Sequence, residues 1–420
     1  MLSDAVEADS SDSPTVGVVL VNLGTPDEPA LPAVRRYLRE FLSDRRIVNL
    51  PPLFWKPILE THIMYGHARL SAAKYASVWY ESGSPLLVHT REQAAALAAR
   101  LSELAGCPVE LSGAESGSAA PAAAPLGNIN SLSGAGSPAD GPAAGPGQTG
   151  AADPSAVPSR PGGAAAGQPA LTVAYAMRYG NPSLGSVLAG LQAAGIGKLL
   201  IVPMYPQYST TTTATVIDAL SSYLGRAQNH PETRWIRSWA ADPGYIEALA
   251  QRIEASWAER GRPDFARGDK LLLSFHGIPV SVTAGGDPYP KECETTADLL
   301  RERLGLGPEH CLMTYQSKFG HGEWLTPATI ETVGKLGELG VARLDVCCPG
   351  FAVDCLETLE EIGLLNRDEF ERRGGGQLVR IPCLNDFGPW IDALAALVWR
   401  HVAGWTDALT QPDPRRRTGL

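Results

Sequence analysis

The sequence predicts an α/β protein made of two similar Rossmann-like domains, each a parallel sheet flanked by helices, with a cleft between them. Short, uninterrupted apolar stretches recur along the chain, which is typical of parallel strands buried on both faces. A loop and an amphipathic helical stretch follow most of these strands. This alternation occurs in two successive runs, each the size of a small doubly wound domain.

The first run opens with a β-branched strand at 16–23, which Gly24 and Pro26 end. The turn at 22–26 lacks a GxGxxG pattern, so a dinucleotide site gains little support. The other strands of this run are expected at 171–177, 198–203 and 233–239, and its helices at 33–42, 90–104, 183–194 and 210–224.

The second run contains a strand at 271–275, and a helix with Ala297, Leu300 and Leu304 at helical spacing follows it. Its other strands are expected at 311–316, 343–347 and 378–381, and its other helices at 245–257, 328–339, 354–365 and 390–402.

These elements predict an N-terminal domain of residues 15–111 plus 171–242 and a C-terminal domain of residues 243–405. Residues 112–170 consist mainly of Ala, Gly, Pro and Ser, with one Arg, no Lys and no aromatic residue. Such a segment buries too little apolar surface to offset its ordering entropy, so we expect a disordered insertion in a surface connection. We also expect a disordered N-terminus at 1–14 and a flexible tail at 406–420.

Composition narrows the function class. The 420 residues carry a formal net charge of −10, which argues against nucleic-acid binding. The seven cysteines include no CxxC pair, and the acidic, polar start is unlike a secretory signal. No apolar run reaches the length of a membrane span. We therefore expect a cytoplasmic small-molecule enzyme with a reducing environment around its thiols.

The stretch 51–80 is unusually apolar and aromatic for a connection after one strand and one helix. Either these side chains pack into the core, or they form an apolar lip around a large flat ligand or a patch facing a membrane. The side chains concerned are Leu53, Phe54, Trp55, Ile58, Leu59, Ile63, Met64 and Tyr65.

Several predicted strands end in chemically active residues. His276 ends the strand at 271–275, and ligands in open α/β sheets bind at the carboxyl ends of strands. Position alone leaves two interpretations for His276, a catalytic imidazole or a hydrogen-bonded loop residue. Arg178 and Tyr179 follow one strand of the first run, and the segment 205–208 follows another.

A carboxylate pair lies on the helix predicted at 354–365. Asp354 resembles an N-cap with Glu357 at the third helical position, which is close to a capping box. Glu361 is four residues further on, on the same face, where like charges disfavour each other slightly. The two carboxylates could instead pass protons or hold a cation, and one imidazole with carboxylates suits iron or zinc.

Several long segments, in the right order, resemble the ferrochelatase family, whose members insert ferrous iron into a porphyrin. The segments are VGVVLVNLGTPDEP, AMRYGNPS, VPMYPQYSTTTTA, LLLSFHGIPVSVTAGGDPYPKEC, TYQSKFGHGEWLTPAT and PGFAVDCLETLEEI. The resemblance covers nearly the whole chain except the extreme ends and the insertion. It implies two chelatase-type domains around a porphyrin cleft, in agreement with the fold predicted above.

The resemblance also implies catalytic roles. His276, in SFHG, matches the family histidine that meets the porphyrin nitrogens or the incoming metal. Glu357, in DCLETLEE, matches its acidic partner across the macrocycle, so the implied metal-contacting residues are His276 and Glu357. Glu361 matches the next carboxylate of the same helix face, on a proton or metal route.

Other positions carry implied porphyrin contacts. Arg69 and Ser84 resemble residues that contact porphyrin carboxylates, and Tyr179, Tyr208 and Trp324 fall in motifs that line the cleft. Arg178 either reaches acidic substrate groups or forms structural ion pairs.

The implied function is insertion of Fe²⁺ into protoporphyrin IX to give protohaem, the terminal step of haem biosynthesis. The alternatives are a coproporphyrin-preferring ferrochelatase, a chelatase inserting cobalt into a more acidic tetrapyrrole, and a non-catalytic porphyrin-binding or haem-delivery protein. The implied partners are porphyrin and ferrous iron, with a peripheral membrane contact, in a monomer or homodimer.

No tightly bound cofactor is expected, and iron is a substrate. Some family members carry a [2Fe–2S] cluster on extra cysteines near the C-terminus, whereas the last cysteine here is Cys383. Cys347 and Cys348 are adjacent at a strand end, and Cys355 replaces a histidine found in some members. We therefore expect no cluster and interpret the cysteines as small packing residues.

Overall fold

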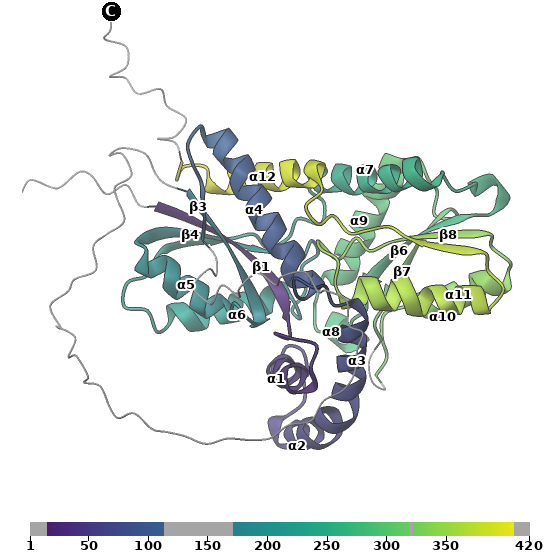
Figure 1. The fold of residues 1–420 in the computed structure, drawn as a ribbon, viewed down its shortest axis with the longest axis horizontal. Helices are drawn as coiled ribbons and strands as arrows, with labels where there is room; N and C mark the ends of the chain where they lie inside the picture. Colours follow the sequence, from purple (N-terminus) through teal and green to yellow (C-terminus); the bar gives the residue numbers. More distant parts are fainter. Residues whose placement is uncertain (1–14, 113–170, 319–321, 407–420) are drawn as a thin grey trace, which may run out of the picture. The chain divides into compact units, whose positions relative to one another are not determined.

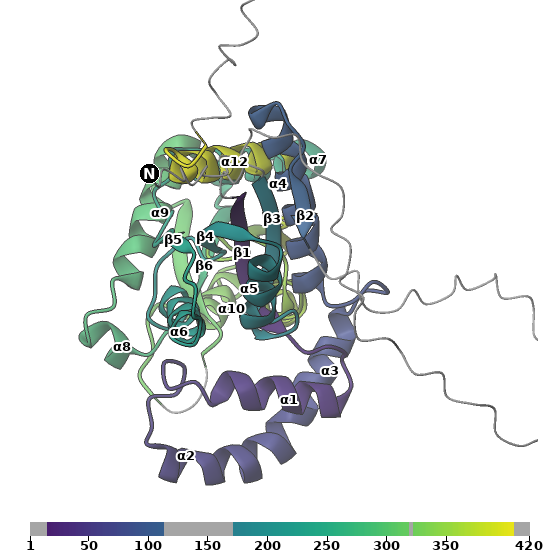
Figure 2. The same ribbon diagram turned by 90° about the vertical axis from the view of Figure 1, so that its left-hand side faces the viewer.

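Two parallel sheets flanked by helices form the computed structural model, which describes residues 15–112, 171–318 and 322–406 (Figures 1 and 2). The predicted fold class is confirmed. No helix in these three ranges is long and apolar enough to cross a membrane.

The N-terminal sheet has the strand order β2-β3-β1-β4-β5. Its strands are β1 (Thr15–Thr25), β2 (Glu110–Ser112), β3 (Leu171–Gly180), β4 (Ile196–Pro203) and β5 (Glu232–Trp235). The helical segments of this half are α1 (Leu31–Leu42), α2 (Pro52–Ile58), the π-helix η1 (Leu59–His67), α3 (Ala68–Val78), α4 (Pro85–Ala105), α5 (Leu184–Ala193) and α6 (Thr213–Leu224).

The central strand β1 shows why its sequence lacks polar alternation. Successive side chains of a strand point to opposite faces. Val18 and Leu20 join a core cluster with α4, whereas Val19 and Val21 join a second cluster with α5 and α6. Because helices cover both faces of β1, both sets of side chains are apolar.

The C-terminal sheet has the order β7-β6-β8-β9. Its strands are β6 (Lys270–His276), β7 (Cys311–Gln316), β8 (Arg343–Cys347) and β9 (Gln377–Arg380). The helical segments of this half are α7 (Pro243–Arg260), the short η2 (Phe265–Arg267), α8 (Val280–Ala284), α9 (Tyr289–Leu304), α10 (Thr329–Glu338), the π-helix η3 (Glu357–Asn366), α11 (Arg367–Arg372) and α12 (Gly388–Val402).

The two sheets share one core. Leu20 of β1 and Leu273 of β6 belong to the same buried cluster. The last helix, α12, packs against both α7 and α4, as Figure 1 shows. One buried cluster thus contains residues from both halves of the chain. The predicted domain boundary at residue 243 stays a prediction.

Several boundaries differ from those predicted. β3 continues through Tyr179 to Gly180 because it stays paired with β1 to that point. β5 ends at Trp235, short of the predicted 239. Ser112, predicted to begin the insertion, ends β2, and Thr406, predicted to begin the tail, is buried. The predictions for 1–14, 113–170 and 407–420 concern residues outside the described ranges.

The expected capping box at Asp354 is wrong. The helix starts at Leu356, and its residues from Glu357 to Asn366 are wound as a π-helix, with i→i+5 hydrogen bonding. The Asp354 N–H donates to Asn385, and the Asp354 carboxylate accepts hydrogen bonds from Arg380, Asn385 and the Thr358 hydroxyl. Partners distant in sequence therefore take over the groups that a capping box would satisfy.

The apolar stretch at 51–80 is buried in part, and whether its exposed side chains contact a ligand or a membrane stays a prediction. Leu59, Ile63 and Met64 are buried in a cluster with α1. The exposed members are Leu53 (81% exposed), Phe54 (67%), Ile58 (43%), Tyr65 (68%) and Leu70 (65%), which we call the apolar face of α2–α3.

Candidate active site

His276 is the last residue of β6 and pairs with Gln316 at the end of β7. Its Nδ1 lies 2.6 Å from the carbonyl oxygen of Gly277. Because a carbonyl oxygen can only accept, Nδ1 carries the proton and donates this bond. In the neutral ring, Nε2 is then left with a lone pair that can accept a proton or bind a metal ion.

Glu361, on η3, has a carboxylate held by the loop that follows β7. It accepts hydrogen bonds from the Ser317 N–H at 2.7 Å and the Ser317 hydroxyl at 2.5 Å. Burial raises the pKa of Glu361; the Ser317 hydrogen bonds and the His276 charge oppose this rise, and the Glu357 charge adds to it. The structure thus brings His276 and Glu357 each within electrostatic reach of Glu361.

Glu357 begins η3 and lines a pocket between the end of β1 and the segment leading into η3. The pocket wall combines an apolar rim with two tyrosines. Its lining residues are Leu23, Gly24, Thr25, Tyr37, Tyr75, Val78, Ser84, Pro85, Leu86, Cys355, Leu356 and Glu357. An acidic group beside an aromatic wall can meet the polar centre of a flat, largely apolar ligand.

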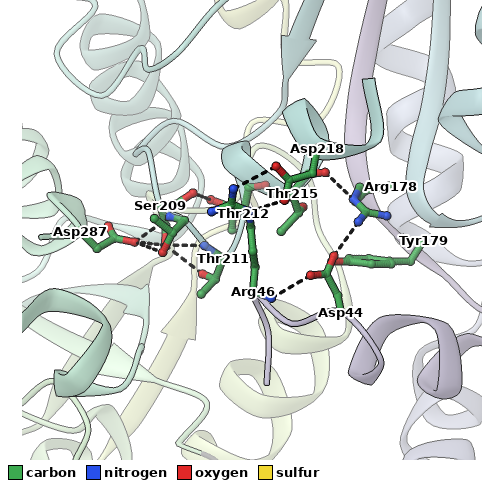
Figure 3. Close-up of polar contacts among 11 residues, drawn as sticks. Asp44, Arg46, Arg178, Tyr179, Ser209, Thr211, Thr212, Thr215, Asp218 and Asp287 are labelled. Atoms are coloured by element: carbon green, nitrogen blue, oxygen red, sulfur yellow. Dashed lines mark hydrogen bonds and ion pairs between the residues drawn. The ribbon is translucent and has the colours of Figure 1, made fainter. Parts of the chain in front are cut away.

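Arg178 and Tyr179 form an ion-paired cluster with Asp44, as Figure 3 shows. One Arg178 Nη lies 2.5 Å from an Asp44 carboxylate oxygen, and Arg178 Nε donates to the Thr215 carbonyl. The Tyr179 hydroxyl donates to the same Asp44 oxygen at 2.8 Å, and Tyr179 is 1% exposed. The structural ion pair is thus present for Arg178, and substrate contact by either residue stays a prediction.

Tyr208 lies on the loop after β4 and is half-buried. Its N–H donates to Glu292 of α9 at 2.7 Å, and the Arg237 guanidinium lies 4.1 Å from its ring centroid. Contacts from both halves therefore hold this loop, although Tyr208 does not line the pocket of Glu357.

The remaining predicted binding residues lie in three places. Ser84 is buried, accepts a hydrogen bond from the Thr25 hydroxyl at 2.7 Å and lines the pocket of Glu357. Trp324 lines a second pocket with Gly277, Gln316 and Lys318, next to the end of β6. Arg69 is exposed on α3.

Sequence reasoning missed the residues that orient this site. Ser317 has a φ of +66°, uncommon for a residue other than glycine, and presents both its N–H and its hydroxyl to Glu361. Its position directly after a predicted strand was the available signal. Tyr37 and Tyr75 lie in the pocket wall; burial raises the pKa of both well above its ordinary value, and the charge of Glu357 adds to the rise.

No group of three or more His, Cys, Asp or Glu side chains in residues 15–112, 171–318 and 322–406 could hold a metal ion. The metal contacts of His276 and Glu357 stay a prediction. Six of the seven cysteines are buried, and burial raises the pKa of Cys347 to about 12. These six thiols pack as small protonated side chains.

A model of the ferrochelatase family matches residues 15–115 and 163–402, and the chain belongs to that family. Family membership implies a porphyrin metal chelatase, a lyase, with a porphyrin and a metal ion as substrates. The resemblance in the sequence motifs is confirmed.

Solved structures with partial similarity include two chelatase-related proteins. SirB from Bacillus subtilis, solved with Fe³⁺, aligns with a TM-score of 0.42 and 11% identity over 56% of this chain and 84% of its own. DR2241 from Deinococcus radiodurans, a multi-domain protein with structural similarity to chelatases, aligns with a TM-score of 0.36 and 18% identity over 54% of this chain and 46% of its own.

Proposed function

We propose that this protein inserts Fe²⁺ into protoporphyrin IX to give protohaem, the terminal step of haem biosynthesis. The observation that carries the proposal is the available Nε2 of His276 near the carboxylate of Glu361, which also interacts with the carboxylate of Glu357. Family membership supplies the reaction class, and the choice of protoporphyrin IX is the part that the experiment below decides.

The reaction requires a proton acceptor and a bent macrocycle. A free-base porphyrin holds two N–H protons in a planar ring, so the metal ion cannot enter in that plane. Binding contacts remote from the nitrogens can bend the ring and expose the lone pairs. His276 Nε2 is the natural proton acceptor near neutral pH. Glu361, held by Ser317, would then take protons onward or deliver the incoming ion together with Glu357.

The decisive assay is anaerobic incubation of the full chain with Fe²⁺ and protoporphyrin IX, followed by absorbance, with coproporphyrin in parallel. We expect His276→Ala and Glu357→Ala each to lower turnover by about 10²-fold or more. His230→Ala and Glu371→Ala, at exposed positions, are the matched controls and should retain wild-type rates. Faster turnover of coproporphyrin would reassign the substrate. Wild-type rates in both site variants, or porphyrin binding without turnover, would overturn the catalytic proposal.

We also propose that the protein works without an iron–sulfur cluster, in the cytoplasm. The described residues support the absence of a cluster, because they contain no group of three or more His, Cys, Asp or Glu side chains that could hold a metal ion, whereas a cluster needs a converging set of cysteine ligands. Iron and acid-labile sulfide analysis of anaerobically purified protein tests it. One equivalent or more of sulfide per chain would contradict the proposal.

The apolar face of α2–α3 supports a peripheral membrane contact. Leu53, Phe54 and Tyr65 are each more than half exposed on neighbouring helical segments. Exposed apolar side chains gathered on successive helical segments suit an apolar ligand or a lipid interface. Leu53→Ser/Phe54→Ser should reduce co-sedimentation with phosphatidylcholine–phosphatidylglycerol vesicles, and Leu339→Ser, at an exposed leucine on another face, should not. Equal co-sedimentation of the wild type and the two variants would show that this surface does not contact the vesicles.

A further inference from the structure

Two histidines lie side by side on the π-helix η1. His62 and His67 are both exposed, while Ile63 and Met64 of the same helix are buried. In an α-helix, residues five apart lie about 140° from each other around the axis. The i→i+5 winding of η1 instead brings the two imidazoles to the same face, with ring centroids 5.4 Å apart and an interplanar angle of 68°.

We propose that His62 and His67 form a two-histidine site for a divalent transition-metal ion. With metal–nitrogen bonds of about 2.0–2.1 Å, each ring centroid lies roughly 3.2 Å from a bound ion, so two rings at a tetrahedral angle have centroids about 5.2 Å apart. The two rings are in T-shaped contact with their centroids 5.4 Å apart, close to this separation, so rotation of the side chains would let one nitrogen of each ring reach a common ion.

The chemistry of the pair favours borderline metal ions. Imidazole nitrogen suits Fe²⁺, Ni²⁺, Cu²⁺ and Zn²⁺ better than Mg²⁺ or Ca²⁺. The acidic residue of the same helix, Glu60, is held by Arg39 at 2.7 Å. Among the described residues no group of three or more His, Cys, Asp or Glu side chains could hold a metal ion, so the proposed site has two protein ligands there, and water would supply others. Coordination through one ring nitrogen leaves the second nitrogen of each imidazole for other contacts.

The position of the pair gives it a role in iron supply, an inference that rests on the proposed function. η1 continues directly into α3, whose Tyr75 and Val78 line the pocket of Glu357. Tyr75 is eight residues beyond His67, about 12 Å along the helix. An ion held by the pair is therefore concentrated near the predicted porphyrin cleft before it reaches His276.

Metal binding is tested first, on the full chain with His276→Ala as background so that the active site does not contribute. Ni²⁺ is titrated calorimetrically at pH 7.5 into the background protein and into His62→Ala, His67→Ala and the double variant. We expect each single variant to bind at least tenfold more weakly and the double variant to bind one Ni²⁺ fewer. His230→Ala, which removes an exposed histidine elsewhere, should not change binding.

A spectroscopic readout separates ligation from a change in folding. Bound Cu²⁺ should show hyperfine coupling to two imidazole nitrogens in the background protein and to one in each single variant. The same Ni²⁺ stoichiometry and affinity in the background protein and the double variant would overturn the site.

The supply role is tested with His276 intact. The double variant should raise the KM for Fe²⁺ and leave kcat unchanged. If Ni²⁺ binds as expected but the KM does not change, the supply role is wrong and the metal site stands. If the wild-type chain turns over no porphyrin, the proposed function and the supply role fail together, and Ni²⁺ binding still decides the site.

Discussion

The buried carboxylate of Asp354 anchors the segment from which Glu357 projects. Its side chain is 4% exposed and accepts hydrogen bonds from Arg380 at 2.7 Å, Thr358 at 2.8 Å and Asn385 at 2.9 Å. Burial by itself would raise the pKa of Asp354, but the Arg380 charge and the hydrogen bonds from Asn385 and Thr358 outweigh it and lower that pKa. The charge therefore persists inside the protein because Arg380 balances it.

Arg380→Met should remove this balance at nearly constant volume. Breaking a buried ion pair by removing one partner costs about 3–5 kcal/mol. Arg380 is 23% exposed, so solvent offsets part of the loss, and we expect a value near the lower limit, about 3 kcal/mol. Arg380→Met/Asp354→Asn should recover a large part of the loss, because no unpaired charge remains buried.

Urea unfolding followed by far-UV circular dichroism measures these differences at pH 7.5. A lowered pKa in the folded state contributes stability above the unfolded pKa, and this stability is lost as the pH falls through the folded pKa. Removing Arg380 removes this contribution. The gap in unfolding free energy between Arg380→Met and wild type should therefore narrow as the pH falls below about 4, through the lowered pKa of Asp354.

Arg367→Met is the matched control. The Arg367–Asp368 ion pair lies nearby on α11 with side chains 42% and 70% exposed, so its loss should cost less than about 1 kcal/mol. An Arg380→Met loss no larger than that of Arg367→Met, or a double variant less stable than Arg380→Met, would refute the role assigned to this pair.

Three further predictions concern backbone, polar contacts and pH. Gly24→Ala should destabilise the protein by well over about 1 kcal/mol in the same urea assay, because Gly24 has a φ of +111° and an added Cβ would lie 1.7 Å from the Tyr179 carbonyl oxygen. Gly185→Ala is the control: no atom lies within 4 Å of a Cβ added at this position on α5, so the change should stabilise the protein by about 0.5–1 kcal/mol. Asp287→Ala removes the acceptor of three hydrogen bonds from the loop after β4 (Figure 3), and it should lower the unfolding free energy by more than about 1.5 kcal/mol. A smaller loss would show that Asp287 does not hold this loop. Burial raises the pKa of Glu361, so ionisation of its carboxyl reduces stability as the pH rises through that raised pKa. The unfolding free energy of Glu361→Gln relative to wild type should therefore increase from about pH 4 upward. A difference in unfolding free energy that does not change with pH would contradict this prediction.

The sequence by itself determined the buried strands and the position of His276, but not the short, exposed strand β2. The runs at 16–23 and 271–275 are readable because a strand buried on both faces needs apolar residues at every position. His276 follows from the rule that ligands bind at the carboxyl ends of parallel strands. Both arguments use only neighbours along the chain.

Only the tertiary structure decided how the charged groups are paired. Arg178 meets Asp44 and Asp354 meets Arg380 across the fold, and no local pattern specifies either pair. The π-helical winding of η3 replaced the expected capping box because Asn385 and Arg380 take up the groups of Asp354 that a cap would use. Charge pairing and helix winding depend on which distant segments pack together, and hydrophobic periodicity along the chain does not specify those contacts.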